Sequence, residues 1–176
     1  MVDASRRRDR GWLGDRFHGL FREIVLHASA REGLLCPTYC LMPDHLHLVW
    51  MGLWRASDQL NGVAFLRRYL EPALAPHKFQ HQPHDHVLKE NERRKNAFAA
   101  VCAYVLENPV RAGSIGNLHK WQFCGAVVPG YPTLHPLQKD FWRKFWEMYS
   151  ESKHEDAGHI LRPPIGWHGP LEARRD

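Results

Sequence analysis

The amino-acid sequence predicts an α+β fold, in which helices pack on an antiparallel sheet. Apolar residues recur at helical spacing in several stretches, which predicts amphipathic helices. Between the first two of these stretches lie two short apolar runs separated by a Pro-Asp pair, which is typical of a β-hairpin. The predicted order is helix, hairpin, helix, strand, helix, and the length of 176 residues suits one domain with a sizeable core.

The first part of the chain predicts one helix and the hairpin. A helix is expected over residues 15–32, because its apolar side chains follow the i, i+3, i+4, i+7 pattern and Gly33 supplies the stop. Residues 34–41 and 45–51 are expected to be strands, and Pro43-Asp44 forms the tight turn between them.

The rest of the chain predicts three more helices and one more strand. Helices are expected over residues 58–73 and 92–107, the second closed by Asn108-Pro109, with a short strand at 85–88 between them. After residue 113 the chain becomes rich in Gly and Pro, and we expect only a helical extension at 136–150 and a polar tail.

The net charge and the cysteine content indicate which partners and which cellular compartment to expect. The net charge of +5 is compatible with a polyanionic partner, although each basic cluster also suits a solvated face. The four cysteines form no CxxC pair, which favours reduced thiols packed in the core of a cytoplasmic protein. No apolar stretch is long enough to cross a membrane, so we expect no membrane partner.

The segment His45-Leu46-His47 is a candidate half of a metal site. Successive side chains of a strand point to opposite faces, so His45 and His47 project together while Leu46 faces the other way. Two imidazoles side by side on a strand can hold a divalent metal if further ligands are near.

The helix at 92–107 carries a tyrosine and an amide on one flank. Tyr104 lies about a quarter-turn from the apolar stripe, and the i, i+4 relation places Asn108 near it. Taken alone, this arrangement is most simply a tyrosine with its hydroxyl at the edge of a helix.

Three ordered segments together carry a more specific signal. Residues 39–50 read YCLMPDHLHLVW, residues 85–88 read DHVL, and residues 104–113 read YVLENPVRAG. With these segments the chain resembles the single-tyrosine HUH transposases (IS200-like), most closely their REP-associated tyrosine transposase branch. The resemblance covers about residues 15–125, which leaves a basic arm at 1–14 and a C-terminal helix and polar tail at 126–176.

The resemblance implies a ferredoxin-like HUH fold and a DNA-cutting site. In that family a His-hydrophobe-His pair holds Mg²⁺ or Mn²⁺, and one tyrosine attacks single-stranded DNA beside a hairpin to form a 5′-phosphotyrosine. It implies that His45, His47 and Asn108 are the metal ligands and that Tyr104 is the nucleophile. Because imidazoles do not favour Mg²⁺ strongly, we expect better activity with Mn²⁺. The residues expected to contact DNA phosphates are Arg6, Arg7, Arg8 and Arg111.

The N-terminus departs from the family pattern. Relatives begin with a strand before the first helix, whereas residues 1–14 do not read as a strand, so either the chain is truncated at its start or the sheet lacks its first strand. A missing strand exposes a sheet edge, and such an edge favours a homodimer.

Two other functions fit the same residues. One is a catalytically decayed or domesticated relative that binds hairpin DNA without cutting it. The other is a metal-binding protein without a nucleic-acid role, which would use the histidine-rich stretch at 77–86. The aromatic residues at helical spacing in 141–149 are interpreted as core rather than as a surface for bases.

Overall fold

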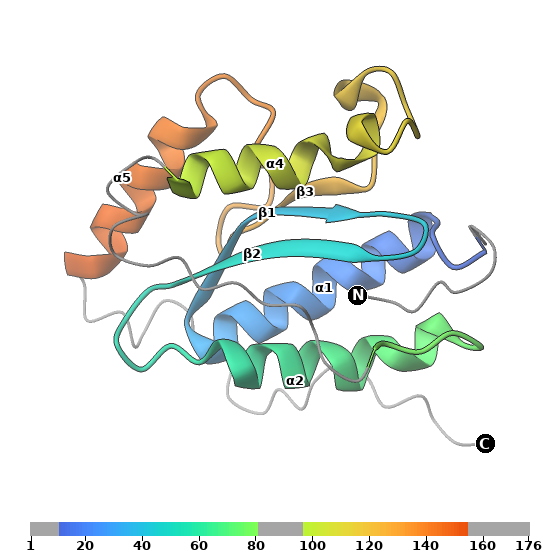
Figure 1. The fold of residues 1–176 in the computed structure, drawn as a ribbon. Coiled ribbons are helices and arrows are strands. Elements are labelled where there is room, and N and C mark those ends of the chain that lie inside the picture. Colours follow the sequence, from blue (N-terminus) through green and yellow to red (C-terminus); the bar gives the residue numbers. More distant parts are fainter. Residues whose placement is uncertain (1–10, 81–96, 155–176) are drawn as a thin grey trace.

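The protein has an α+β architecture in which helices cover both faces of an antiparallel sheet (Figure 1). The computed structural model describes residues 11–80 and 97–154. The helices of these ranges are α1 (Asp15–Glu32), α2 (Gln59–Leu70), α4 (Ala97–Arg111) and α5 (Phe141–His154), with 3₁₀ turns η1 (Glu71–Leu74) and η2 (Leu118–Lys120). The strands are β1 (Leu34–Leu41), β2 (Leu46–Gly52) and β3 (Cys124–Val127).

The central strand of the sheet is β1. In the described part of the chain the sheet has three strands in the order β2-β1-β3, and both pairings are antiparallel. Every residue of β1 is buried, because strands flank it on both sides and helices cover both its faces. The register pairs Cys40 with His47 on β2 and with Cys124 on β3, so these three side chains project to the same face.

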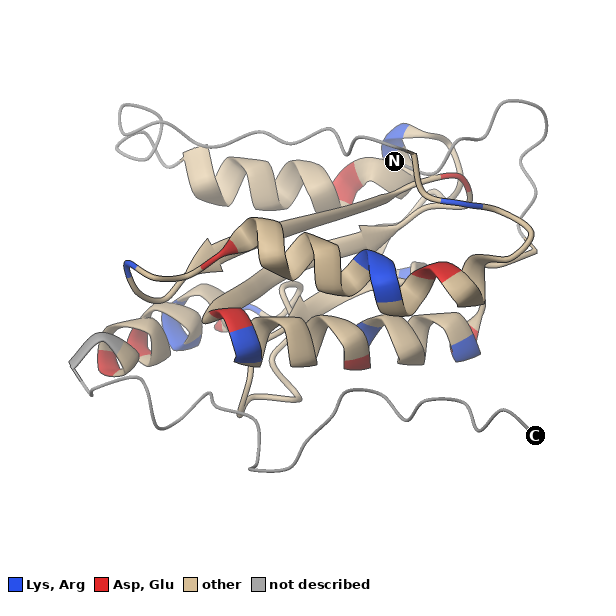
Figure 2. Ribbon diagram, turned by 90° about the horizontal axis from the view of Figure 1, so that it is seen from below, with Lys and Arg blue, Asp and Glu red and all other residues tan. Residues whose placement is uncertain are grey.

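Each face of the sheet has its own core. On one face, Leu46, Leu48 and Trp50 pack with Tyr39 and Leu41 against buried residues of α1 and α2. Figure 2 views the molecule from this side and shows basic and acidic residues interspersed along the helices. On the other face, Val49 and Cys40 pack with α4, and residues of β1 and β3 pack with α5. The two cores separate the odd-numbered from the even-numbered residues of β2, as alternation along a strand requires.

The predicted α1, β1 and hairpin are confirmed. Helix α1 ends at Gly33, whose φ of +63° is the left-handed conformation that favours glycine. The ring of Trp54 lies where a Cβ of residue 33 would project, so this position excludes a side chain for a second reason. Helix α2 begins after Asp58, whose side chain accepts a hydrogen bond from the backbone N–H of Asn61.

The prediction that Asn108-Pro109 closes the tyrosine helix was wrong, because α4 continues through Pro109 to Arg111. Proline has no N–H to donate to the carbonyl four residues earlier, which is that of Val105. The Asn108 side chain replaces that donor, since its Nδ2 lies 3.2 Å from the Val105 carbonyl oxygen and 3.0 Å from that of Tyr104. The helix therefore passes the proline without leaving this carbonyl unpaired.

Strand β3 was not predicted. It is four residues long, lies in a Gly/Pro-rich stretch and contains Gly125, so it lacks the apolar alternation that indicates a strand. Pairing with β1 forms it, and Gly125 fits because the Tyr39 hydroxyl fills the space of a side chain there, 2.8 Å from an ideal Cβ. The expected boundary at residue 125 falls inside this strand.

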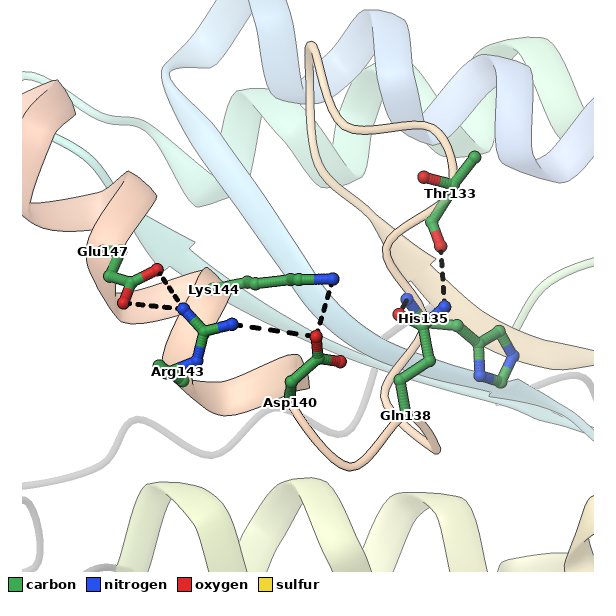
Figure 3. Close-up of polar contacts among 7 residues, drawn as sticks. All are labelled: Thr133, His135, Gln138, Asp140, Arg143, Lys144 and Glu147. Carbon is green, nitrogen blue, oxygen red and sulfur yellow. Dashed lines mark hydrogen bonds and ion pairs between the residues drawn. The ribbon is translucent and has the colours of Figure 1, made fainter.

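The C-terminal helix was predicted over 136–150 and is found at α5. Residues 136–140 form turns instead, held in part by the Gln138 side chain, which donates to the Thr133 carbonyl at 3.3 Å. Asp140 stands just before the helix, where a carboxylate is favoured, and pairs with Lys144 at 2.7 Å (Figure 3). Phe141 and Phe145 are fully buried, which confirms the core interpretation for them, whereas Trp146 is 42% exposed.

Several predicted features lie wholly or partly outside the described residues: most of the N-terminal arm at 1–14, the strand at 85–88, the first residues of the helix at 92–107, and the polar tail after residue 154. The four cysteines are free and buried, so their predicted packing in the core is confirmed. No helix in the described ranges is long and apolar enough to cross a bilayer.

Candidate functional site

The structure brings the two histidines together at the start of β2. His45 lies in the turn directly before the strand and His47 is its second residue. Their ring centroids are 4.7 Å apart and the rings are nearly perpendicular, with an interplanar angle of 88°. The prediction that both project to one face is therefore confirmed, and pairing of His47 with Cys40 shows that this is the face covered by α4.

Asp44 holds the ring of His45. The Nδ1 of His45 lies 2.6 Å from an Asp44 carboxylate oxygen, so the protonated Nδ1 donates to that oxygen. In the neutral ring this leaves the lone pair on Nε2, the atom available to a metal or a proton. Sequence reasoning interpreted Asp44 only as a turn residue, although its position next to His45 was the available signal.

His47 is electrostatically suited to remain neutral. Burial, together with the smaller effect of the neighbouring His45, lowers the pKa of His47 to about 4. A neutral imidazole has a free lone pair, and a metal ligand must be unprotonated. His47 therefore presents a lone pair at neutral pH and well below it.

Helix α4 carries the second group of residues. Tyr104 is 48% exposed, so its ring is accessible to a large substrate. The guanidinium carbon of Arg111 lies 4.6 Å from the centre of that ring, which is a cation–π contact. Because Asn108 uses its amide nitrogen for two helix carbonyls, its Oδ1 is the atom left to accept or to bind a cation.

The two groups lie on the same side of the sheet. Val105 and Leu106, which follow Tyr104, pack in one cluster with Met42 at the end of β1. The backbone N–H of Met42 in turn donates to the His45 carbonyl at 2.7 Å. Figure 1 shows the C-terminal end of α4 above the same end of the sheet at which β2 begins. Within residues 11–80 and 97–154, however, no hydrogen bond or ring contact joins Tyr104 directly to either histidine.

The histidine pair alone does not complete a site for a divalent cation, and Asn108 is the candidate third donor. Among the described residues no three side chains of His, Cys, Asp or Glu converge on one point, so the histidine pair lacks a third ligand of those types. An amide oxygen from α4 would supply the hard donor that Mg²⁺ and Mn²⁺ prefer. Two imidazoles and one amide oxygen would make a donor set closer to the preference of Mn²⁺ than to that of zinc.

Most of the remaining predicted residues lie outside the part of the chain that the structure describes. Arg6, Arg7 and Arg8 lie outside the described residues, as do the histidines between positions 81 and 86. His77 is described and half-buried, and its backbone N–H donates to the Leu74 carbonyl.

Comparison of the chain with protein-family models, with curated proteins and with solved structures finds no match.

Proposed function

We propose that this protein is a metal-dependent endonuclease and strand transferase acting on single-stranded DNA beside hairpins, with a ferredoxin-like HUH fold. The observation that carries the proposal is the position of His45 and His47 on the sheet face that α4 covers, where Val105 and Leu106, next to Tyr104, pack with Met42 beside the histidine turn. The resemblance of the sequence to single-tyrosine HUH transposases supplies the reaction class. The geometry supports it because both predicted halves of the site occur on one side of the molecule.

His45, His47 and Asn108 would hold the divalent cation. Asp44 orients His45, burial keeps His47 neutral, and the two helix carbonyls orient the amide of Asn108. When bound, Mg²⁺ or Mn²⁺ withdraws charge from the scissile phosphate and orients it for in-line attack.

Tyr104 performs the covalent step. Its phenolic oxygen attacks the phosphorus, a P–O bond to tyrosine forms, and the bond to the 3′-oxygen of the preceding nucleotide breaks. The phenolic proton is lost and the leaving 3′-oxygen gains one, so the product is a 5′-phosphotyrosine and a free 3′-hydroxyl. Arg111 lies against the tyrosine ring, where its guanidinium can donate to a phosphate oxygen. The reverse attack by a 3′-hydroxyl rejoins the strand without an external energy source.

The test is covalent capture of DNA. Purified protein is incubated with Mn²⁺ and a 3′-labelled oligonucleotide that carries a single strand next to a hairpin. We expect a labelled protein band with wild type and with the control Tyr131→Phe, because Tyr131 is also exposed but lies in the loop before α5. Tyr104→Phe should form no adduct. An adduct of equal yield in Tyr104→Phe would refute the proposed nucleophile.

A second function is a hairpin-DNA-binding module that no longer cuts. One observation favours it: in the described part of the chain Tyr104 contacts Arg111 rather than either histidine. This function predicts hairpin binding that weakens steeply with salt, no adduct, and affinity that Tyr104→Phe leaves unchanged.

A further inference from the structure

Two tryptophans hold the turn that carries Asp44 and His45. The indole Nε1 of Trp12 donates to the Pro43 carbonyl at 2.8 Å, and the indole Nε1 of Trp121 donates to the Leu41 carbonyl at 3.1 Å. Both partners are separated from the tryptophans by long stretches of sequence. We infer that Trp12 and Trp121 are positioning residues that fix the histidine-bearing turn relative to both helical layers, an inference that rests on the proposed function for its consequence in metal binding.

The two indoles approach the turn from opposite faces of the sheet. Trp12 is 8% exposed, packs edge-on against Phe17 with ring centroids 4.7 Å apart, and belongs to the core beneath α1 and α2. Trp121 packs instead with the cluster that includes Met42, Val105 and Leu106 on the α4 face. The acceptors, Leu41 and Pro43, flank Met42, so the segment entering the turn is held from both sides.

The turn needs external donors because its own backbone supplies few. Pro43 has no N–H, and the described bond that closes the turn runs from the Met42 N–H to the His45 carbonyl. Each of the two tryptophan rings packs edge-on against a phenylalanine ring, which restricts its movement. A carbonyl that accepts a hydrogen bond from such an indole therefore has little freedom to rotate. The orientation of the peptide groups between Leu41 and His45 in turn determines where Asp44 and the ring of His45 stand.

Trp121 also connects this turn to the nucleophile helix. It follows η2, which comes directly after the loop from α4, and it shares a cluster with the two residues that follow Tyr104. A shift of α4 relative to the sheet would therefore act on the Leu41 carbonyl through Trp121. Trp121 therefore contacts both the segment that leads to His45 and the helix that carries Tyr104.

The test removes each indole N–H and retains an aromatic ring. Trp12→Phe and Trp121→Phe are compared with Trp146→Phe, a partly exposed tryptophan on α5, as the matched control. Hydrogen exchange of the Met42 amide reports on the turn, and Mn²⁺ affinity measured by electron paramagnetic resonance reports on the ligands. Where phenylalanine leaves too little folded protein, benzothienylalanine at the same position retains the bicyclic shape and lacks the N–H.

We expect each of the two variants to accelerate exchange at Met42 by about fivefold and to weaken Mn²⁺ binding by a similar factor, as loss of one net hydrogen bond predicts. Exchange equal to that of Trp146→Phe would overturn the inference. Faster exchange with unchanged Mn²⁺ affinity would also overturn it, because the tryptophans would then stabilise the turn without positioning its ligands. Absence of Mn²⁺ binding in wild type would refute the proposed metal site, and the exchange rates would still decide whether the indoles hold the turn.

Discussion

Acid should destabilise this protein partly through His47, and replacement of His47 by glutamine should remove that part. The pKa of His47 is about 4 in the folded protein because of burial and the neighbouring His45, whereas an unfolded histidine titrates near 6.5. Between pH 6.5 and pH 4, His47 is protonated in the unfolded chain but neutral in the folded protein. The unfolding free energy therefore falls as the pH falls. The effect is absent above pH 6.5 and complete below pH 4.

The magnitude follows from the two pKa values. Their difference corresponds to about 3 kcal/mol of unfolding free energy, and solvent screening at a side chain that is only half-buried reduces the observable part to about 2 kcal/mol. His18, His27 and His135 also have lowered pKa values through burial, so wild type should lose more than this in total. The difference between wild type and His47→Gln isolates the contribution of His47.

Urea unfolding at pH 7.0 and pH 4.5 measures this difference. We expect the unfolding free energy of wild type to fall by about 2 kcal/mol more than that of His47→Gln between the two pH values. The control Leu60→Gln introduces the same side chain at an exposed position of α2 without removing a titratable group, and it should retain the full wild-type dependence. Equal losses of unfolding free energy in wild type and His47→Gln would refute this prediction. His47 would then have the same pKa in the folded and the unfolded protein.

Three further substitutions test other contacts of the structure. Arg111→Lys keeps the charge but loses the planar group that stacks on Tyr104, so single-turnover adduct formation should slow by about tenfold with unchanged unfolding free energy; an unchanged rate would contradict the stacking role. Gly125→Ala places a methyl group 2.8 Å from the Tyr39 hydroxyl and should cost about 1–3 kcal/mol in urea unfolding. The cost should shrink in a Tyr39→Phe background, and an equal cost in both backgrounds would show that the hydroxyl is not the obstacle. Asn108→Ala removes the donor to two helix carbonyls and should lower the unfolding free energy by about 1 kcal/mol and weaken Mn²⁺ binding, whereas unchanged Mn²⁺ affinity would exclude the amide as a ligand.

Local periodicity predicted the elements whose signals lie within a few residues. The strand alternation of His45, Leu46 and His47 predicted which side chains share a face, because that geometry repeats every two residues. Helix α1 and its end at Gly33 followed from the 3.6-residue spacing and from a glycine that can adopt positive φ. The neighbourhood of Tyr104 and Asn108 likewise required only the helical repeat.

Features that depend on distant partners were not predictable in this way. Strand β3 exists because β1 pairs with it and because Tyr39 fills the space beside Gly125. Neither interaction can be predicted from residues 124–127 alone. The helix passes Pro109 because the side chain of Asn108 replaces a lost donor, an exception to the usual rule that a proline ends a helix. The hydrogen bonds of the Trp12 and Trp121 indoles were likewise not predictable, since their carbonyl acceptors lie 31 and 80 residues away along the chain.

The sequence by itself determined the chemical content of the candidate site, which is two imidazoles on one strand face and a tyrosine, an amide and an arginine within eight residues of one another. Only the structure showed that all three of the latter lie on one helix. Only the tertiary structure decided that both groups lie on the same side of the sheet, because that depends on which face α4 covers. It also decided that His47 is neutral and that Asp44 and two indoles hold the turn, since burial and hydrogen bonding arise from packing between elements. Residue types are local properties, whereas pKa values and orientations are properties of the assembled core.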